Sequence, residues 1–202
     1  MEEDIRDVRV GGPSRVHCVD ARALPLDDDS IDAVITSPPY PNRHDYTRVF
    51  AVELELGFSL GPAIKDLRYR ALHSHPEARR PSHVPSYHEA DVLTTQVDQV
   101  AQRHPDPRIP RMLSGYFEDL FVVLSEIRRV LVPAGRAALI VGNAQYSGIS
   151  IPVDEHLADV AERAGFVVDS VNTLRMRGNS AQQMAVYGRR AARESAVCLT
   201  LA

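Results

Sequence analysis

Residues 32–40, DAVITSPPY, combine side chains that could take part in chemistry with a backbone that could hold them in place. The two consecutive prolines lack amide hydrogens and keep the chain extended, so the segment must leave any sheet after Thr36. The Ser37 hydroxyl and the Pro38 carbonyl can accept the two hydrogens of an amine, and the Tyr40 ring can stack on a planar group. The segment therefore predicts a rigid site that holds and polarises an amine.

Two short apolar segments come before this motif. Residues 15–19 and 31–36 are each expected to form a buried strand, with turn residues between them that include Asp20, Ala21 and the acidic stretch 27–29. Open α/β sheets bind ligands at the carboxyl ends of their strands. We therefore expect the proline-rich segment to line a ligand site.

The carboxyl half alternates between helical and strand-like patterns. Apolar residues spaced for one helical face predict a core helix over 116–131, and a second helix is expected over 152–164. Continuous apolar segments predict strands over 136–141, 166–174 and 195–201. This order predicts an α/β fold with a parallel sheet and an antiparallel pairing of the last two strands.

Residues 61–111 interrupt this regular pattern with many prolines and histidines. One amphipathic helix is expected inside this segment, over 89–103, and another just before it, over 49–58. We expect a catalytic half-domain formed by residues 1–60 and 112–202. Residues 61–111 are expected to be an insertion or lid that could take part in substrate recognition.

The Ser-Pro-Pro-Tyr motif resembles that of the amino-methyltransferases, which use S-adenosyl-L-methionine to methylate an exocyclic base amine. Its serine form, as against the Asp-Pro-Pro-Tyr form, is most similar to the DNA cytosine-N4 methyltransferases, and residues 36–53 resemble a subset of bacterial DNA methylases. Residues 139–143 and Gly165-Phe166 resemble the fifth strand and a later turn of the same family. The resemblance implies a partial Rossmann-like class I methyltransferase sheet.

The resemblance also implies roles for individual residues on a base that is rotated out of double-stranded DNA. The catalytic candidates are Ser37, Pro38, Pro39 and Tyr40, and the cofactor-binding candidates are Asp20, Ala21 and Ser37. We expect nucleic-acid contacts from basic, aromatic and amide side chains after the motif and in a polar loop between the last two strands. These candidates are Arg43, His44, Tyr46 and Arg48, followed by Arg175, Arg177, Asn179 and Gln182.

One expected feature of this family does not occur in the sequence, namely the glycine-rich cofactor loop after the first strand. Gly11-Gly12-Pro13-Ser14 opens no helix and does not replace it. A second polypeptide could supply the loop, giving a split enzyme, and we prefer this explanation. Alternatively a homo-oligomer completes the site, or the chain is a non-catalytic nucleic-acid-binding or scaffold subunit. For an enzyme, adenine N6 and RNA remain the alternative substrates.

Composition narrows the class of protein. The 202 residues are 44% hydrophobic and 25% charged with a net charge of −4, which is typical of a globular protein with an ordinary core. No apolar run approaches the roughly 18 residues needed to cross a bilayer, and the acidic residues 1–4 are unlike a signal peptide, so we expect a cytoplasmic protein. The histidines between His73 and His88 lack carboxylate or cysteine partners at metal-binding spacing, so we expect no metal site.

Overall fold

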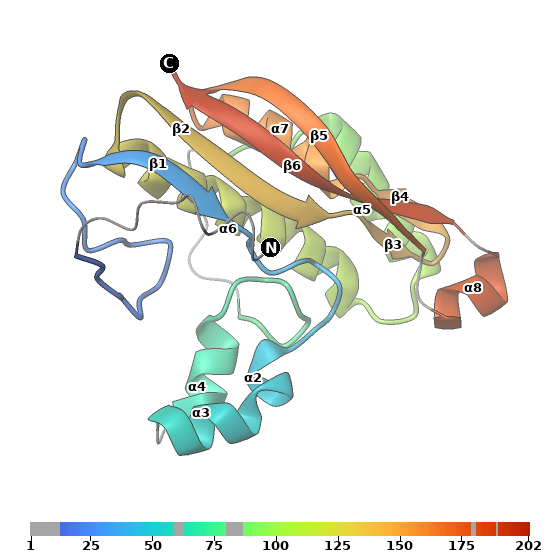
Figure 1. Cartoon of the computed structure of the whole chain (residues 1–202). Helices are drawn as coiled ribbons and strands as arrows, with labels where there is room; N and C mark the ends of the chain where they lie inside the picture. The colour runs from blue at the N-terminus through green and yellow to red at the C-terminus, as the bar shows by residue number, and fades with distance from the viewer. Residues whose placement is uncertain (1–12, 59–62, 80–86, 179–180, 189) are drawn as a thin grey trace, which may run out of the picture.

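The computed structural model contains a four-stranded mixed sheet with two long helices behind it (Figure 1). It describes residues 13–58, 63–79, 87–178, 181–188 and 190–202. The strands lie in the order β1 (Ile31–Thr36), β2 (Leu131–Gly142), β6 (Ala191–Leu201) and β5 (Phe166–Gly178). Strand β1 is parallel to β2, whereas β6 is antiparallel to both β2 and β5. A small hairpin pairs β3 (Ala144–Tyr146) with β4 (Ile149–Ile151).

Seven helices are described in these parts of the chain. Three short ones, α2 (Tyr46–Val49), α3 (Ala51–Phe58) and α4 (Ala63–Arg70), follow β1. The others are α5 (Asp91–Arg103), α6 (Arg108–Val130), α7 (Val153–Arg163) and α8 (Ala181–Tyr187). None of these described helices is both long enough and apolar enough to cross a membrane.

Burial alternates along the central strands because α6 and α7 cover one face of the sheet (Figure 1). Leu139 of β2 and Val197 of β6 face these helices and are fully buried. On the opposite face Ile140 and Cys198 are only half-buried, and the side chain of Ile35 in β1 is 81% exposed. Among the described elements, one apolar face of the sheet therefore remains open.

Most of the predicted elements are confirmed, including the antiparallel pairing of the last two strands. The strand expected over 15–19 is wrong, because residues 13–20 form no strand and Val16 is 95% exposed. Helix α6 begins eight residues before the predicted start at 116, since Ile109 and Leu113 extend its buried face. The polar loop expected after residue 174 is also wrong at its start, because β5 continues to Gly178.

The segment 61–111 contributes to the same hydrophobic core as the rest of the chain. Leu93, Val97 and Val100 of α5 are buried in the cluster that includes Phe117 of α6. The α/β fold is therefore established by the described elements, while the division into a catalytic half-domain and an insertion stays a prediction.

Candidate active site

The predicted catalytic loop leaves the sheet where β1 ends beside β2. Thr36 pairs with Leu139, and the next residue, Ser37, turns its hydroxyl toward the sheet. Ser37 Oγ lies 3.1 Å from the carbonyl oxygen of Ile140. A carbonyl cannot donate, so the serine hydrogen is committed to Ile140 and the lone pairs of the serine oxygen remain as acceptors. The local structure thus makes Ser37 a hydrogen-bond acceptor for any group in front of it.

Tyr40 points back toward the sheet. Its hydroxyl donates a 2.6 Å hydrogen bond to Glu194 Oε1 on β6, and Arg175 of β5 donates to the other carboxylate oxygen. Burial, followed by the bond to Glu194, raises the pKa of Tyr40, and the hydrogen bond from Arg175 lowers the pKa of Glu194. At neutral pH this is a phenol bonded to a carboxylate, and it holds the end of the catalytic loop on the sheet.

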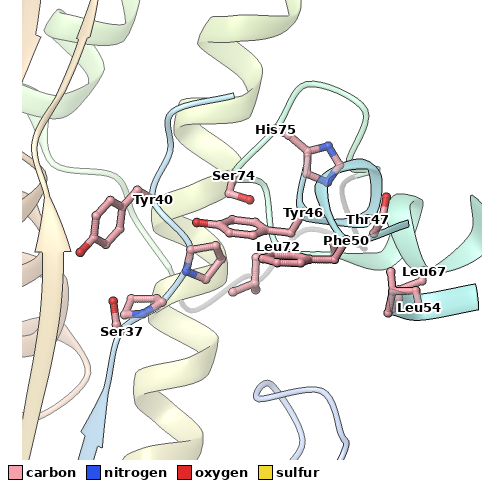
Figure 2. Close-up of a pocket in the computed structure, with 13 residues that line it drawn as sticks. Ser37, Tyr40, Tyr46, Thr47, Phe50, Leu54, Leu67, Leu72, Ser74 and His75 are labelled. Atoms are coloured by element: carbon pink, nitrogen blue, oxygen red, sulfur yellow. The ribbon is translucent and has the colours of Figure 1, made fainter. Parts of the chain in front are cut away.

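A cavity of about 650 Å³ lies between this loop and the short helices (Figure 2). Residues 37–40 line one side of it, and the other side is mostly apolar. Tyr46 and Phe50 form a stacked pair there, with ring centroids 6.3 Å apart and planes within 9° of parallel. Ser74 and His75 add polar side chains. A mostly apolar cavity of this size with a few polar groups is typical of a site for a flat organic ligand.

Asp45 fixes the helical wall of this cavity. Its side chain caps α2 by accepting from the Thr47 amide at 3.0 Å, and it pairs with Arg68 at 2.7 Å and Arg48 at 3.0 Å. Ligand atoms of Asp45, His75 and Glu77 lie within 4.8 Å of one another. Two guanidinium groups already neutralise Asp45, which favours an ion-pair network over a metal site.

Asp20, a predicted cofactor contact, is occupied by a neighbouring arginine. Arg22 donates to both carboxylate oxygens, at 3.0 Å and 2.8 Å, and reaches Asp119 of α6 at 2.9 Å. The hydrogen bond from Arg22 lowers the pKa of Asp20. Asp20 and Ala21 lie in a turn and are not among the described residues that line the cavity. The structure therefore does not bring Asp20 and Ser37 together in the cavity.

The predicted nucleic-acid contacts fall into two groups. After the motif, Tyr46 lines the cavity with His44 edge-on to its ring at 6.4 Å, Arg43 has a left-handed φ of 70°, and Arg48 pairs with Asp45. In the second group Arg175 and Arg177 lie on β5 with 63% and 52% of their side chains exposed. Asn179 and the side chain of Gln182 lie outside the described residues.

Three residues near the site could not be found from the sequence. Phe50 completes the aromatic wall, His75 is buried beside the cavity, and Glu194 binds Tyr40. Glu194 precedes the apolar segment that marks its strand, and only the pairing of β6 with β2 places it opposite Gly142. Such a register cannot be inferred from one strand alone.

No family model matches the chain. It is 35% identical over 185 residues to the type II methyltransferase M.AvaI of Nostoc sp. (strain PCC 7120 / SAG 25.82 / UTEX 2576), covering 84% of this chain and 38% of that protein. M.BsoBI of Geobacillus stearothermophilus is 33% identical over 198 residues, which cover 86% and 39% of the two chains. A DNA modification methylase of Thermus thermophilus, TTHA0409, matches with a TM-score of 0.44 at 16% identity over 94% of this chain and 54% of that one, which is too distant to establish a shared fold.

These sequence similarities confirm the resemblance that the Ser-Pro-Pro-Tyr motif predicts. The chain is a relative of the type II methyltransferases and spans less than two fifths of their length.

Proposed function

We propose that the chain is the catalytic part of a DNA methyltransferase that transfers a methyl group to the exocyclic amine of a base rotated out of the duplex, with cytosine N4 as the preferred acceptor. The observation that carries this proposal is the Ser37 hydroxyl, which is committed as an acceptor at the cavity by its bond to Ile140. An amine nitrogen donates two hydrogens, so it requires acceptors there. The similarity to type II methyltransferases supports the same class of reaction.

The residues of the chain would act by holding and polarising the amine. Ser37 and the carbonyl of Pro38 accept its two hydrogens, which draws the nitrogen lone pair out of conjugation with the base ring. The stacked Tyr46 and Phe50 offer an aromatic wall for the base. In such a site positioning provides most of the catalysis, and no strong general base is required.

S-adenosyl-L-methionine would supply an electrophilic methyl group bound to a positively charged sulfur. The cavity fits the reacting end of this cofactor, because it joins an acceptor hydroxyl to apolar and aromatic walls. Its nucleoside end finds less support on this chain. Asp20, the candidate for that end, has both carboxylate oxygens bound by Arg22. The described residues therefore fit part of the cofactor, and further groups are needed for the rest.

We infer that a second polypeptide carrying a glycine-rich loop completes the cofactor site, and that it docks on the open side of the sheet. Strand β1 pairs only with β2 among the described strands, so its other edge carries unpaired backbone groups. The open face next to that edge is apolar and includes the 81% exposed Ile35. More than half of each relative lies outside the matched part, which leaves ample length for such a segment. A second copy of this chain is the alternative occupant.

The segment 61–111 would then contribute to substrate binding. Helix α4 supplies Leu67 to the cavity, and the following turn supplies Leu72, Ser74 and His75. These contacts support the predicted role of the segment in recognition.

The first test is calorimetric titration of S-adenosyl-L-methionine into the purified chain, with its native mass measured in the same buffer. Micromolar binding by a monomer or homo-oligomer would overturn the requirement for a second polypeptide. Without binding, the chain is purified with its partner and incubated with unmethylated DNA, and the digested nucleosides are analysed by mass spectrometry. N4-methylcytosine is expected; N6-methyladenine would correct the acceptor. Salt-dependent DNA binding with no methylated product would point to the non-catalytic alternative.

A further inference from the structure

Glu194 occupies a position where three strands meet the catalytic loop. On β6 it pairs with Gly142 of β2 on one side and with Arg175 of β5 on the other. These pairings place Glu194 on the open face of the sheet, beside the ring of Tyr40. Only 7% of Glu194 is exposed. A carboxylate so far removed from water is costly unless its partners compensate the charge.

The partners of Glu194 come from two parts of the chain with different predicted roles. Oε1 accepts from the hydroxyl of Tyr40 at 2.6 Å, and Oε2 accepts from Nε of Arg175. Nη1 of Arg177 lies 3.7 Å from Oε1. One carboxylate thus contacts the catalytic loop and both arginines that are expected to meet DNA.

We infer that Glu194 is a positioning residue that joins Tyr40 and Arg175 into one hydrogen-bonded unit, so that contact of Arg175 with a DNA phosphate changes how Tyr40 is held. This inference rests on the proposed function, because it assumes that the exposed face of Arg175 meets DNA. The guanidinium can exchange its carboxylate partner for a phosphate, which offers the same bidentate geometry. The carboxylate then has Tyr40 as its remaining direct hydrogen-bond partner among the described residues.

Such a coupling must act in both directions. If binding of a phosphate to Arg175 changes the hydrogen bond between Glu194 and Tyr40, the state of Tyr40 must change the affinity for the phosphate by the same factor. Tyr40 belongs to the loop that places Ser37 in front of the cavity. Occupancy of the DNA-backbone contact and alignment of the catalytic loop are therefore linked through one buried side chain.

The first test reads the position of Tyr40 without using activity. The full chain, with its partner polypeptide where one is required, is labelled with 3-fluorotyrosine, and the Tyr40 resonance is assigned in the fluorine NMR spectrum from Tyr40→Phe. We expect Glu194→Ala to shift this resonance. Arg175→Ala should also shift it in the wild-type background and should have no further effect once Glu194 is alanine. Equal shifts in both backgrounds, or an unmoved resonance in Glu194→Ala, would overturn the inference.

The second test separates positioning from general stability. Glu126→Ala is the matched control, because Glu126 is also part-buried and bound to an arginine, Arg129, but contacts no lining residue of the cavity. We expect Glu194→Ala to lower kcat by about 10-fold to 100-fold, with KM for S-adenosyl-L-methionine within about twofold, while Glu126→Ala keeps both constants. Glu194→Gln retains an acceptor for Tyr40 and should recover part of kcat.

The two tests fail in different ways. A wild-type assembly that methylates no DNA would overturn the proposed function, whereas the dependence of the Tyr40 resonance on Arg175 and Glu194 would still decide whether the unit exists. Equal losses of kcat in Glu194→Ala and Glu126→Ala, in step with their melting temperatures, would reduce Glu194 to a structural residue.

Discussion

The ring of Tyr40 occupies the space that a side chain at Gly142 would need. A Cβ at Gly142 would lie 2.9 Å from Cε2 and 3.0 Å from Cδ2 of that ring. Gly142 is the last residue of β2, and its lack of a side chain lets the loop after β1 fold back against the sheet. The same approach brings the Tyr40 hydroxyl within reach of Glu194.

Gly142→Ala is expected to displace Tyr40 and misalign the catalytic loop. A displacement of about 1 Å can reduce a rate by on the order of 100-fold when catalysis depends on positioning. We therefore expect methyl transfer by the complete assembly to fall by about 10-fold to 100-fold, with a lower melting temperature. Gly178→Ala in β5 is the control, because a Cβ there meets nothing within 4 Å. Equal activity of the two variants would show that the position of Tyr40 does not matter for the reaction.

Ser37→Ala removes the acceptor that the proposed chemistry requires. Loss of one preorganised hydrogen-bonding group of this kind reduces kcat by about 100-fold to 1000-fold. The loss of stability should stay near 1 kcal/mol, because the hydroxyl makes a single exposed hydrogen bond. Ser30→Ala, at the start of the segment that leads into β1, removes a comparable exposed bond to the carbonyl of Asp27 and should leave methyl transfer intact. Radiolabelled methyl incorporation measures both variants, and an active Ser37→Ala enzyme contradicts the assignment.

Ile35→Glu tests whether the open face of the sheet receives a second polypeptide. The isolated variant should remain as stable as the wild type, since this side chain is 81% exposed. Its affinity for the completing polypeptide should fall at least about 10-fold, because association would bury a charge without a partner. Val92→Glu, on the 64% exposed side of α5, is the control and should assemble normally. Analytical ultracentrifugation of the mixtures decides, and normal assembly of Ile35→Glu would place the interface elsewhere.

Asp154 should make the fold sensitive to acid. Burial alone would raise its pKa, but hydrogen bonds from Arg193 and Ser195 outweigh this effect and hold the pKa below its usual value. A depressed folded-state pKa stabilises the protein above the unfolded value of about 3.9, and this stability is lost as the pH falls through the folded-state pKa. We expect the free energy of unfolding to fall below about pH 4.

Asp154→Asn is expected to reduce this acid dependence and to destabilise the fold at pH 7 by about 3 kcal/mol, because it leaves the Arg193 charge without its carboxylate. Urea unfolding at a series of pH values measures both effects. The control is Asp159→Asn, whose ion pair with Arg163 is exposed on α7 and should matter little. An unchanged acid slope in Asp154→Asn would assign the effect to other carboxylates.

The sequence by itself determined the elements of the carboxyl half and the position of the catalytic motif. The helices α6 and α7 and the strands around them follow from residue periodicity, which is a local property of the chain. The turn at Ser37 follows from two prolines that cannot continue a strand. The prediction for residues 15–19 failed because an apolar segment becomes a strand only where a neighbouring strand offers hydrogen bonds, and none of the described strands does so there.

Only the tertiary structure decided what surrounds the motif. The aromatic wall of Tyr46 and Phe50, the polar contribution of His75 and the bond between Tyr40 and Glu194 all join residues that the fold brings together. Arg175 reaches Glu194 because β5 extends past its apolar part and pairs with β6 in one register. A change of register by one residue would turn Glu194 to the other face of the sheet. Pairing and long-range packing depend on the whole chain at once, and for that reason local patterns could locate the serine but not its surroundings.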